Sequence, residues 1–423
     1  MKAQPVTRTV SRRSRASAAK ASKIRVGLVG LGRRGAQFLD LLLAMPDVEV
    51  PALCTASATS RAAAVGRIRK ACGTEPETYR RREDYARLVA REDLDAVLVT
   101  TAWDSHAEIA VAAMKAGKYV AVEVPVALTL EECWRLVDTH EQTGVPCMML
   151  ENWSFRRDNL AVLNMIRAGL LGDIIHCHCA HSHNCIPIWF FDSQGRPRWA
   201  ADYLRKYNAD QYPTHSVGPV LSWMNINCGD RFAYLTSTAT RQVGINDQLR
   251  TLFGANHPAA RRRYVQGDIV TTVVKTARGN TLVINYDMQL PRPYDNRWLI
   301  QGSRGVYSEA HNAVYLHGRS PRSEEWEPFD PYQKRHDHPW WKHLDPQVAR
   351  LGHGGTDYLE LRLFLDAVRD RTSPPIDLYD SVVMSCLIPL SGQSIAQSSA
   401  PVECPDFTRG RWKRRRPSFA VVG

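Results

Sequence analysis

Long apolar runs are missing from this 423-residue sequence. No segment approaches the about eighteen consecutive apolar residues that cross a membrane, so no transmembrane helix is expected. Cysteine is scarce: ten residues in a chain of this length do not make a disulfide scaffold and indicate reduced, mostly buried thiols. Apolar residues make up 44% and charged residues 23%, which excludes a mainly disordered, collagen-like or coiled-coil chain. The length allows two or three domains with a substantial core.

Acidic residues are missing from residues 1–23 and 409–416, near the two ends of the chain. Residues 1–23 carry seven basic side chains and residues 409–416 carry six, whereas the remainder holds 42 basic and 43 acidic residues. The net charge of +12 is therefore assigned to two basic tails, 1–22 and 401–423. Neither tail interleaves aromatic residues at stacking spacing, so we expect solvated tails, with residues 1–22 disordered, rather than arms for nucleic acid.

Arg12 and Arg13 resemble the start of a twin-arginine export signal. An apolar segment of about 7–15 residues should follow, but residues 15–23 are small, polar and basic. We therefore expect a cytoplasmic protein and leave export open.

Strands and helices alternate over residues 23–150. Strands are expected at 23–30, 48–54, 95–101, 119–123 and 147–150, and helices at 36–45, 61–71, 107–116 and 129–144. Thr129 and Glu132 have the spacing of a capping box. The alternation predicts an α/β domain with a doubly wound parallel sheet, a Rossmann domain.

The pattern changes over residues 151–400. Alternating strands are expected at 174–183, 232–240, 268–276, 281–288 and 298–301, and helices at 159–168, 356–369 and 380–397. This pattern predicts a C-terminal α+β domain with a mostly antiparallel open sheet, which would bind the substrate. Residues 317–350 are rich in Pro, Trp, His and Asp and predict a long loop over a site.

A glycine-rich loop follows the first strand. Gly30, Gly32 and Gly35 have G-x-G-x-x-G spacing and open a helix, which predicts a dinucleotide with its pyrophosphate at the helix N-terminus. The ribose-binding acid expected about 20 residues later is replaced by Thr55. NAD is the first choice, and NADP stays open because no carboxylate at Thr55 repels a 2′-phosphate.

Several further motifs carry a family resemblance. They are Cys147–Asn152, Val162–Gly172, Tyr212–His215, Pro291–Tyr294 and Gly352–Asp357. Together they resemble glycoside hydrolase family 109, the NAD-dependent α-N-acetylgalactosaminidases of the Gfo/Idh/MocA superfamily, from about Lys23 to Gln397. Ordinary sugar dehydrogenases of that superfamily carry a lysine that assists hydride transfer where this chain has Val124, which argues against a routine dehydrogenase.

The resemblance implies site residues by position. Cofactor contacts are implied for Arg33, Arg34, Trp103, Asp104, Ser105, His106, Glu123, Val124, Asn152 and Tyr212, and substrate contacts for Tyr212, Pro213, Thr214, His215 and Tyr294. Three family positions are altered: the ribose aspartate is Thr55, a substrate tyrosine is His181, and a substrate arginine is Ala200. The last two alterations bear on which sugar is accepted.

The family's chemistry is elimination through a transient ketone. NAD⁺ oxidises the sugar C3 hydroxyl, the C2 proton becomes acidic, the C1 oxygen leaves, water adds, and the hydride returns, so the cofactor stays bound. We expect His215 to be an acid/base group and Tyr212 to position the substrate. The alternatives are a structural histidine at a helix start and a core tyrosine. Tyr294 could only pack, and His353 could line the site or cap a helix.

The strand at 176–183 is rich in histidine and cysteine. Period 2 places Cys177, Cys179, His181 and His183 on one face, but residues about 7 Å apart along a strand do not converge on one ion. We therefore predict no metal, with His181 and His183 lining the sugar pocket above the two cysteines. Residues 336–343 could form a sugar-stacking lid or a surface loop with packed tryptophans.

Three functions compete at this stage. The first is a glycosidase acting on N-acetylhexosaminides with recycled NAD. The second is an NAD(P)-dependent sugar or cyclitol dehydrogenase, and the third is a non-catalytic sugar or nucleotide sensor. A homodimer is expected by analogy with open-sheet domains of the superfamily.

Overall fold

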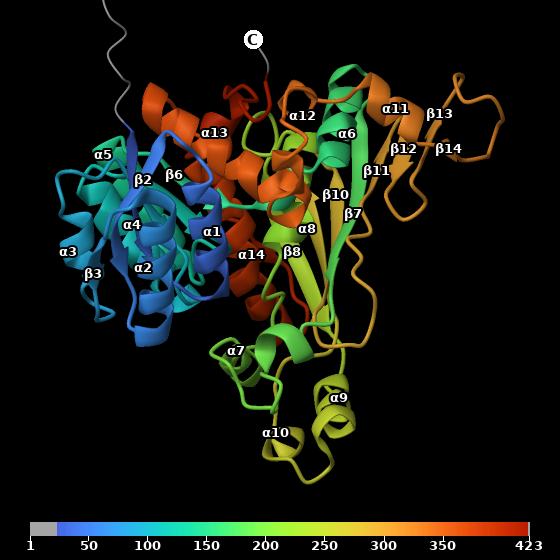
Figure 1. Ribbon diagram of the computed structural model, residues 1–423. Helices are drawn as coiled ribbons and strands as arrows, with labels where there is room; N and C mark the ends of the chain where they lie inside the picture. Colours follow the sequence, from blue (N-terminus) through green and yellow to red (C-terminus); the bar gives the residue numbers. More distant parts are fainter. Residues whose placement is uncertain (1–22, 422–423) are drawn as a thin grey trace, which may run out of the picture.

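The computed structural model describes residues 23–421 of the protein (Figure 1). The N-terminal basic tail, with Arg12 and Arg13, lies outside the described residues. Within the described part, no helix is long and apolar enough to cross a bilayer.

The first domain is a six-stranded parallel sheet in the order β3-β2-β1-β4-β5-β6. Its strands are β1 (Ile24–Val29), β2 (Val48–Cys54), β3 (Glu77–Tyr79), β4 (Ala96–Val99), β5 (Tyr119–Glu123) and β6 (Cys147–Leu150). Its helices are α1 (Arg33–Leu43), α2 (Ala58–Cys72), α3 (Tyr85–Val89), α4 (His106–Lys115) and α5 (Leu130–Thr143). Every residue of β4, β5 and β6 is buried, as expected for a parallel sheet covered on both faces. The predicted Rossmann domain is confirmed, including the Thr129–Glu132 capping box.

The second domain is built on a nine-stranded sheet in the order β14-β13-β12-β11-β7-β10-β9-β8-β15. Its strands are β7 (Ile174–Ser182), β8 (Phe232–Ala239), β9 (Val270–Thr276), β10 (Thr281–Asp287), β11 (Leu299–Gly302), β12 (Gly305–Ser308), β13 (Ala313–Leu316), β14 (Glu327–Pro328) and β15 (Val402–Glu403). Only the β7–β10 pair is parallel among these neighbours, so the predicted mostly antiparallel sheet is confirmed.

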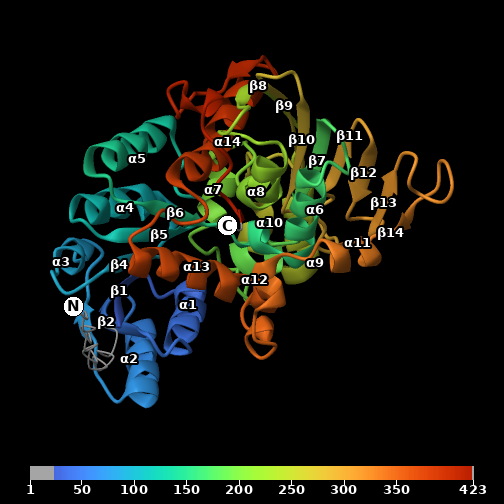
Figure 2. The same ribbon diagram turned by 90° about the horizontal axis from the view of Figure 1, so that it is seen from above.

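Helices of the second domain cover one face of this sheet (Figure 2). They include α6 (Arg157–Arg167), α8 (Thr214–Trp223) and α14 (Leu378–Ala396), with α13 (Thr356–Asp370) lying toward the first domain. A lobe of short helices projects below the sheet in Figure 1 and comprises α7 (Ala201–Lys206), α9 (Gly244–Phe253) and α10 (Pro258–Arg261).

The buried helix α14 joins the two domains. Its serine hydroxyls accept hydrogen bonds from backbone amides of both: Ser385 from Val126 and Ser381 from Met149 in the first domain, and Ser394 from Ser237 in the second. These bonds satisfy amides that burial removes from water. The two domains are therefore held in one arrangement around the carboxyl ends of the parallel strands.

The segment 317–350 differs from the predicted long loop. It contains β14, α11 (Asp330–Arg335) and α12 (Pro339–Lys342). The ring of Trp340 stacks on Phe155 at 5.9 Å and contacts Phe419, and the indole of Trp341 donates to the Phe155 carbonyl at 2.8 Å. The tryptophans are therefore packed, and the sugar-stacking lid is not retained.

The C-terminal segment 401–421 corrects the predicted solvated tail. β15 pairs with β8, and Phe407, Phe419 and Ala420 are buried. The arginines form ion pairs with acids of the body: Arg409 with Asp138 and Glu141, Arg411 with Glu141, and Arg415 with Asp377. These ion pairs hold the C-terminal segment against the folded body, whereas Lys413, Arg414 and Arg416 are exposed.

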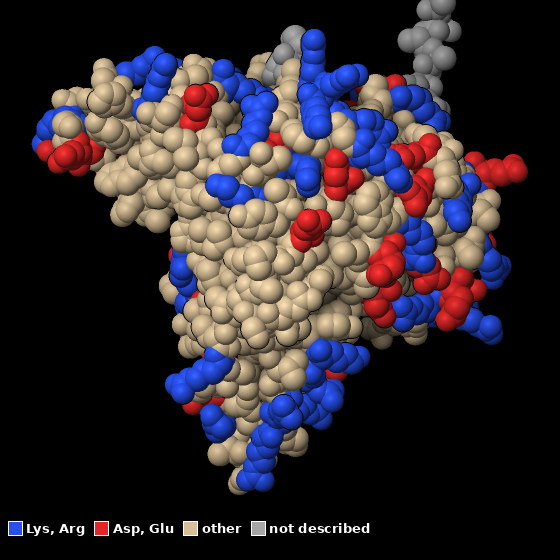
Figure 3. Space-filling view, turned by 180° about the vertical axis from the view of Figure 1, so that it is seen from behind, with Lys and Arg blue, Asp and Glu red and all other residues tan. Residues whose placement is uncertain are grey.

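Positive charge gathers instead on the projecting lobe (Figure 3). Its exposed arginines include Arg205, Arg250, Arg261, Arg262 and Arg263. Residues 24–408 and 417–423 together carry nearly equal numbers of acidic and basic side chains, but these charges are unevenly distributed over the surface of the protein.

Candidate active site

The glycine loop has the shape of a phosphate cradle. Gly30 has φ +93°, and a Cβ there would lie 2.6 Å from the Thr100 carbonyl. A Cβ on Gly35 would lie 2.3 Å from the Gly30 carbonyl oxygen. Gly32, by contrast, faces open space at the N-terminus of α1, where no side chain caps the helix. The chain therefore fits a dinucleotide, whose pyrophosphate can approach the free amides at Gly32.

Arg34 ties this loop to the rest of the site. Its guanidinium donates to Glu123 at 2.5 Å and to Asp357 of α13 at 2.9 Å. Asp357 also accepts from Asn152 at 2.7 Å and contacts His353 Nδ1 at 2.8 Å. Burial alone would raise the pKa of Asp357, but His353 and Arg34 outweigh it and hold that pKa well below its usual range. Predicted cofactor residues Arg34, Glu123 and Asn152 thus share one network.

Other predicted cofactor residues turn their side chains elsewhere. Asp104 is exposed and accepts from Arg82 at 3.0 Å, and the Ser105 hydroxyl donates to the Ala102 carbonyl at 2.9 Å. The ring nitrogens of buried His106 lie 2.7 Å from the Pro125 carbonyl and 3.1 Å from the Thr101 carbonyl. His106 therefore joins the ends of β4 and β5.

The predicted ribose position lies at the end of β2. Thr55 is half-buried, and its carbonyl accepts from Arg61 at 3.0 Å. Ser57 caps α2 by accepting from the Ser60 amide at 3.2 Å. The hydroxyls of Thr55 and Ser57 and the guanidinium of Arg61 therefore lie at this strand end. Arg33, beside the loop, is exposed.

His215 is held by a buried carboxylate. Its Nδ1 lies 2.8 Å from Glu151 Oε1, and its Nε2 lies 3.4 Å from the Tyr212 hydroxyl. Glu151 follows β6 and caps the turn Asn152–Phe155 by accepting from the Trp153 and Ser154 amides. Glu151 is fully buried, so a neutral His215 donates from Nδ1 and presents Nε2 as its proton acceptor.

Four predicted substrate residues cluster around His215. The ring of His181 lies 5.0 Å from Tyr212, 5.4 Å from His215 and 5.5 Å from Tyr294, measured between centroids. His183 lies 4.9 Å from Tyr294. Tyr212 and His215 are 4.9 Å apart, because α8 begins at Thr214 directly after Pro213. Residues from β7, α8 and the segment before β11 therefore converge beside Glu151.

Burial sets the protonation of this cluster. It lowers the pKa of His181 well below its ordinary value, with the nearby His215 and His183 adding to the effect. It raises the pKa of Tyr212 well above 10, and it also raises that of Tyr294. Near neutral pH, the imidazole of His181 is therefore neutral and the phenols of Tyr212 and Tyr294 are protonated.

Three buried polar atoms at the site have no protein partner among residues 23–421. They are Asn152 Oδ1, Thr214 Oγ1 and His181 Nδ1. Buried polar groups are rarely left without hydrogen bonds. Their placement beside Arg34 and His215 fits a polar ligand held between the two domains. Pro213 is buried. Ala200 is buried among apolar residues that include Ile186 and Phe190, and its side chain has no polar atom to offer a sugar.

The histidine-rich strand β7 divides its side chains between the two faces of the sheet. No group of three or more His, Cys, Asp or Glu side chains suited to a metal is found within residues 23–421. Cys177 and Cys179 are buried in the core, while His176 and His178 contact Thr281 and Asn285 across β10. All ten cysteines are free thiols.

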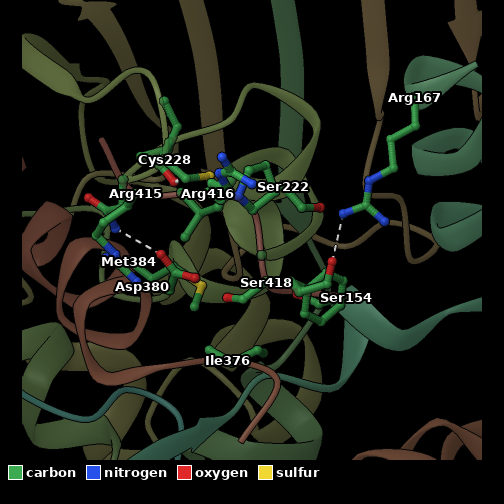
Figure 4. A pocket seen from close by; sticks show the side chains of 16 residues that line it. Ser154, Arg167, Ser222, Cys228, Ile376, Asp380, Met384, Arg415, Arg416 and Ser418 are labelled. Carbon is green, nitrogen blue, oxygen red and sulfur yellow. Dashed lines mark hydrogen bonds between the residues drawn. The ribbon is translucent and has the colours of Figure 1, made fainter. Parts of the chain in front are cut away.

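A separate pocket lies on the other side of α8 (Figure 4). Arg167, Cys228, Asp380 and Arg415 are among its lining residues, and Arg167 donates there to the Phe419 carbonyl. Its cavity of about 30 Å³ admits little more than a water molecule, so it is not a sugar site.

Sequence reasoning missed Glu151 and Asp357 as partners within the site. Glu151 belongs to the motif Cys147–Asn152 and Asp357 to the motif Gly352–Asp357, but the motifs alone assigned no role to either residue. Glu151 lies 64 residues from His215 and Asp357 lies 323 residues from Arg34, so only the fold pairs them. The one local signal is an acid directly before a turn whose amides need a cap.

Comparisons with known proteins agree on one family. Residues 155–414 match the family described as "Glycosyl hydrolase 109, C-terminal domain", and residues 24–151 match "Oxidoreductase family, NAD-binding Rossmann fold". A glycosyl hydrolase family 109 protein of Stenotrophomonas maltophilia (strain K279a) is 36% identical over 96% of this chain and 93% of its own length. An alpha-N-acetylgalactosaminidase of Tannerella forsythia is 37% identical over 94% and 89%.

A solved structure shares the fold at lower identity. A levoglucosan dehydrogenase in complex with NADH and levoglucosan aligns with a TM-score of 0.69 and 20% identity, covering 91% of this chain and 100% of its own. That likeness shows the two-domain fold alone. The family match over most of the second domain and the relatives along nearly the whole chain decide the assignment: this chain belongs to glycosyl hydrolase family 109, a glycoside hydrolase with a nicotinamide-binding Rossmann domain.

Proposed function

We propose that the protein hydrolyses α-N-acetylgalactosaminides with a tightly bound NAD that is recycled in each turnover. The observation that carries this proposal is the Glu151–His215 pair beside Tyr212, in a site where Val124 supplies no amine. The name of the Tannerella forsythia relative supports the choice of sugar.

The chemistry that NAD supplies when bound is reversible oxidation at sugar C3, which acidifies the C2 proton and permits elimination of the C1 oxygen. Gly30, Gly32 and Gly35 would hold the pyrophosphate. Arg33, Thr55, Trp103, Asn152 and the segment Asp104–His106 would contact or position the remainder of the cofactor. NAD is preferred to NADP, although the Thr55 strand end has no carboxylate to repel a 2′-phosphate.

His215 would move a proton at Nε2. Glu151 fixes the imidazole with Nδ1 as donor, so Nε2 faces Tyr212 and can accept a proton and later return it. Glu151 also stabilises the charged imidazolium that forms. Tyr212, a protonated phenol, would donate a hydrogen bond to a sugar oxygen and hold the ring beside the nicotinamide.

His181, His183, Tyr294 and Thr214 would bind the sugar. His181 offers a neutral ring nitrogen and Thr214 a buried hydroxyl, and neither has a protein partner at that atom within the described residues. Because His181 and Ala200 differ from the family pattern, the accepted sugar is the part of the proposal most in need of a direct assay.

The assay compares glycosides with free sugars. Incubate the purified protein with 4-nitrophenyl N-acetylhexosaminides, and separately with free sugars and NAD⁺ or NADP⁺. Nitrophenol release from the α-N-acetylgalactosaminide without net NADH is the expected result. Net NADH from a free sugar would instead establish the dehydrogenase alternative.

A variant tests the role of His215. His215→Ala should lower nitrophenol release about a hundredfold or more while the cofactor stays bound, as measured by mass spectrometry of the protein's extract. Normal release from this variant would remove His215 from the proposed mechanism.

We also propose that the protein forms a dimer through the uncovered face of the nine-stranded sheet. Helices cover one face of this sheet (Figure 2), and Tyr234 of β8 and Val273 of β9 are exposed to solvent. Most soluble oligomers are homodimers with such self-complementary faces. Light scattering should give twice the chain mass for the protein and the single-chain mass for Val273→Glu; a monomeric wild type would overturn the proposal.

A further inference from the structure

A row of aromatic side chains runs outward from the candidate site. Trp199, Tyr203 and Tyr207, which we call the aromatic ladder, precede, occupy and follow helix α7. Their spacing of four residues places them on one side of a helical segment. Ring centroids are 6.1 Å apart for Trp199 and Tyr203, and 5.7 Å apart for Tyr203 and Tyr207, which stack.

The ladder is continuous with the site through Trp103. The Trp103 ring stacks against Tyr212 at 5.8 Å and meets Tyr203 edge-on at 4.9 Å and Trp199 at 5.4 Å. A path of contacting rings therefore leads from the phenol beside His215 to the surface of α7.

The ladder ends in solvent. Trp199 is 43% exposed and Tyr207 is 53% exposed, although both are large aromatic residues. Grouped exposed aromatics beside a binding site mark a surface that a ligand covers.

The chemistry of this surface fits a saccharide chain. The flat rings of Trp and Tyr present an apolar face, which matches the face of a pyranose ring that carries only C–H groups. Single-stranded nucleic acid also stacks on aromatic rings, but it needs cations along its backbone. Exposed arginines occur elsewhere on the projecting lobe, but the two that neighbour the ladder in sequence are engaged: Arg198 donates to the Ile188 carbonyl, and Arg205 pairs with Asp202.

We propose that the aromatic ladder is the subsite for the leaving-group side of the substrate. The inference rests on the proposed function for the sugar held beside His215. It adds that further sugar units, attached through the glycosidic oxygen, stack on Trp199 and Tyr207 outside the site.

The test compares two substrates with one terminal sugar. Measure kcat/KM for the methyl α-N-acetylgalactosaminide and for an oligosaccharide ending in the same residue. Trp199→Ala and Tyr207→Ala should each lower the ratio of oligosaccharide to methyl glycoside kcat/KM by about five- to tenfold, mainly through KM. Trp326→Ala is the matched control: Trp326 is 45% exposed but lies beside β14, and its loss should leave the ratio unchanged.

Direct binding separates this inference from the proposed function. Titrate wild type and Tyr207→Ala with the oligosaccharide lacking its terminal sugar, using saturation-transfer NMR. Binding by wild type that weakens in the variant supports the ladder even if no glycoside is hydrolysed. An unchanged kinetic ratio in both variants, no binding of the glycan, or displacement of the glycan by single-stranded RNA would overturn it.

Discussion

Glu151 orients His215 much as a carboxylate orients the histidine of other acid/base pairs. Its Oε1 faces His215 Nδ1, while its Oε2 accepts from the Ser154 amide at 2.9 Å and the Ser154 hydroxyl at 2.5 Å. These local bonds fix the carboxylate before any ligand arrives. The imidazole therefore enters the reaction with its tautomer and direction already set.

Glu151→Gln should reduce kcat by about a hundredfold or more. The amide keeps the shape of the side chain but cannot stabilise the imidazolium, and its NH₂ group can turn toward His215 and favour the wrong tautomer. Steady-state hydrolysis of the 4-nitrophenyl glycoside measures the change.

The matched control is Glu131→Gln, which alters an exposed glutamate on α5 and should leave kcat unchanged. Cofactor content, measured by absorbance after extraction, should be equal in both variants and wild type. A Glu151→Gln enzyme with wild-type kcat would show that the pair only supports the fold.

Particular residues show how far the sequence predicts the site. The sequence predicted that His215 and Tyr212 serve one site, and the structure places their rings 4.9 Å apart at the start of α8. Glu151 and Asp357 were not assigned, because a carboxylate's partner is set by which strands and helices the fold brings together. Ser105 and Asp104 satisfy their own side chains locally, which position in a motif does not disclose.

At the scale of elements, α8 packs unusually close to the turn that holds Glu151. A Cβ on Gly218 would lie 1.9 Å from Glu151 Oε2 and 2.7 Å from Ser154 Oγ. Glycine at this point of the helix allows the contact, and no larger residue fits without moving the carboxylate.

Gly218→Ala should therefore lower both stability and activity. We expect a loss of ~1–3 kcal/mol in the free energy of unfolding from overpacking, together with a lower kcat because Glu151 is displaced. Gly66→Ala on α2, where a Cβ meets nothing within 4 Å, should instead stabilise by ~0.5–1 kcal/mol. Urea unfolding with matched activity assays checks both; a Gly218→Ala protein that gains stability as Gly66→Ala does would contradict the packing argument.

Asp210 gives the segment before α8 a pH dependence. It is buried, its Oδ1 accepts from the Tyr212 amide at 3.2 Å, and its Oδ2 has no partner among the described residues. Burial raises its pKa to about 7, above the ~3.9 expected in the unfolded chain. Between these values the folded state binds the proton more tightly, so its stabilising contribution is present at low pH and is lost as pH rises toward 7.

Asp210→Asn should remove the loss of folding stability that wild type shows as pH rises, because an amide does not ionise. The stability of the variant relative to wild type should rise by roughly 2 kcal/mol between pH 5 and pH 8. Exposed Asp247→Asn is the control and should show no such rise. Chemical unfolding at both pH values gives the comparison, and a relative stability independent of pH would refute the assignment of Asp210 as a protonated buried acid.

At the scale of the whole molecule, residues 402–421 belong to the folded body. β15 extends the nine-stranded sheet, and the ring of Phe407 packs 4.7 Å from Trp134 of α5 in the first domain. The C-terminal segment therefore links the two domains on the side opposite the projecting lobe's tip.

Phe407→Ala should cost ~3–5 kcal/mol of unfolding free energy, because a fully buried ring leaves a cavity. Lys413→Ala, which alters an exposed side chain of the same segment, should change it by less than ~0.5 kcal/mol. Thermal unfolding followed by circular dichroism measures both. If the two variants were equally stable, the segment would behave as the solvated tail that the sequence predicted.

The basic composition of residues 401–421 led to a wrong prediction of a solvated tail. The hydrophobic periodicity, by contrast, correctly predicted the fold class of both domains. Six basic residues within 409–416 suggested solvent, but Asp138, Glu141 and Asp377, far away in sequence, neutralise three of them. The short strands β12 to β15 were missed because two to four residues carry too little periodicity. The long strands and the helices α6, α13 and α14 were predicted because their patterns extend over many residues, whereas the buried helix α8 was not.

The central claim is that a hydride briefly leaves the substrate so that its C2 proton can be removed and the glycosidic bond can break. Hydrolysis in D₂O tests it most directly. The account predicts one deuterium at C2 of the released N-acetylgalactosamine, with no net NADH. Product without deuterium at C2, formed at a normal rate, would contradict it.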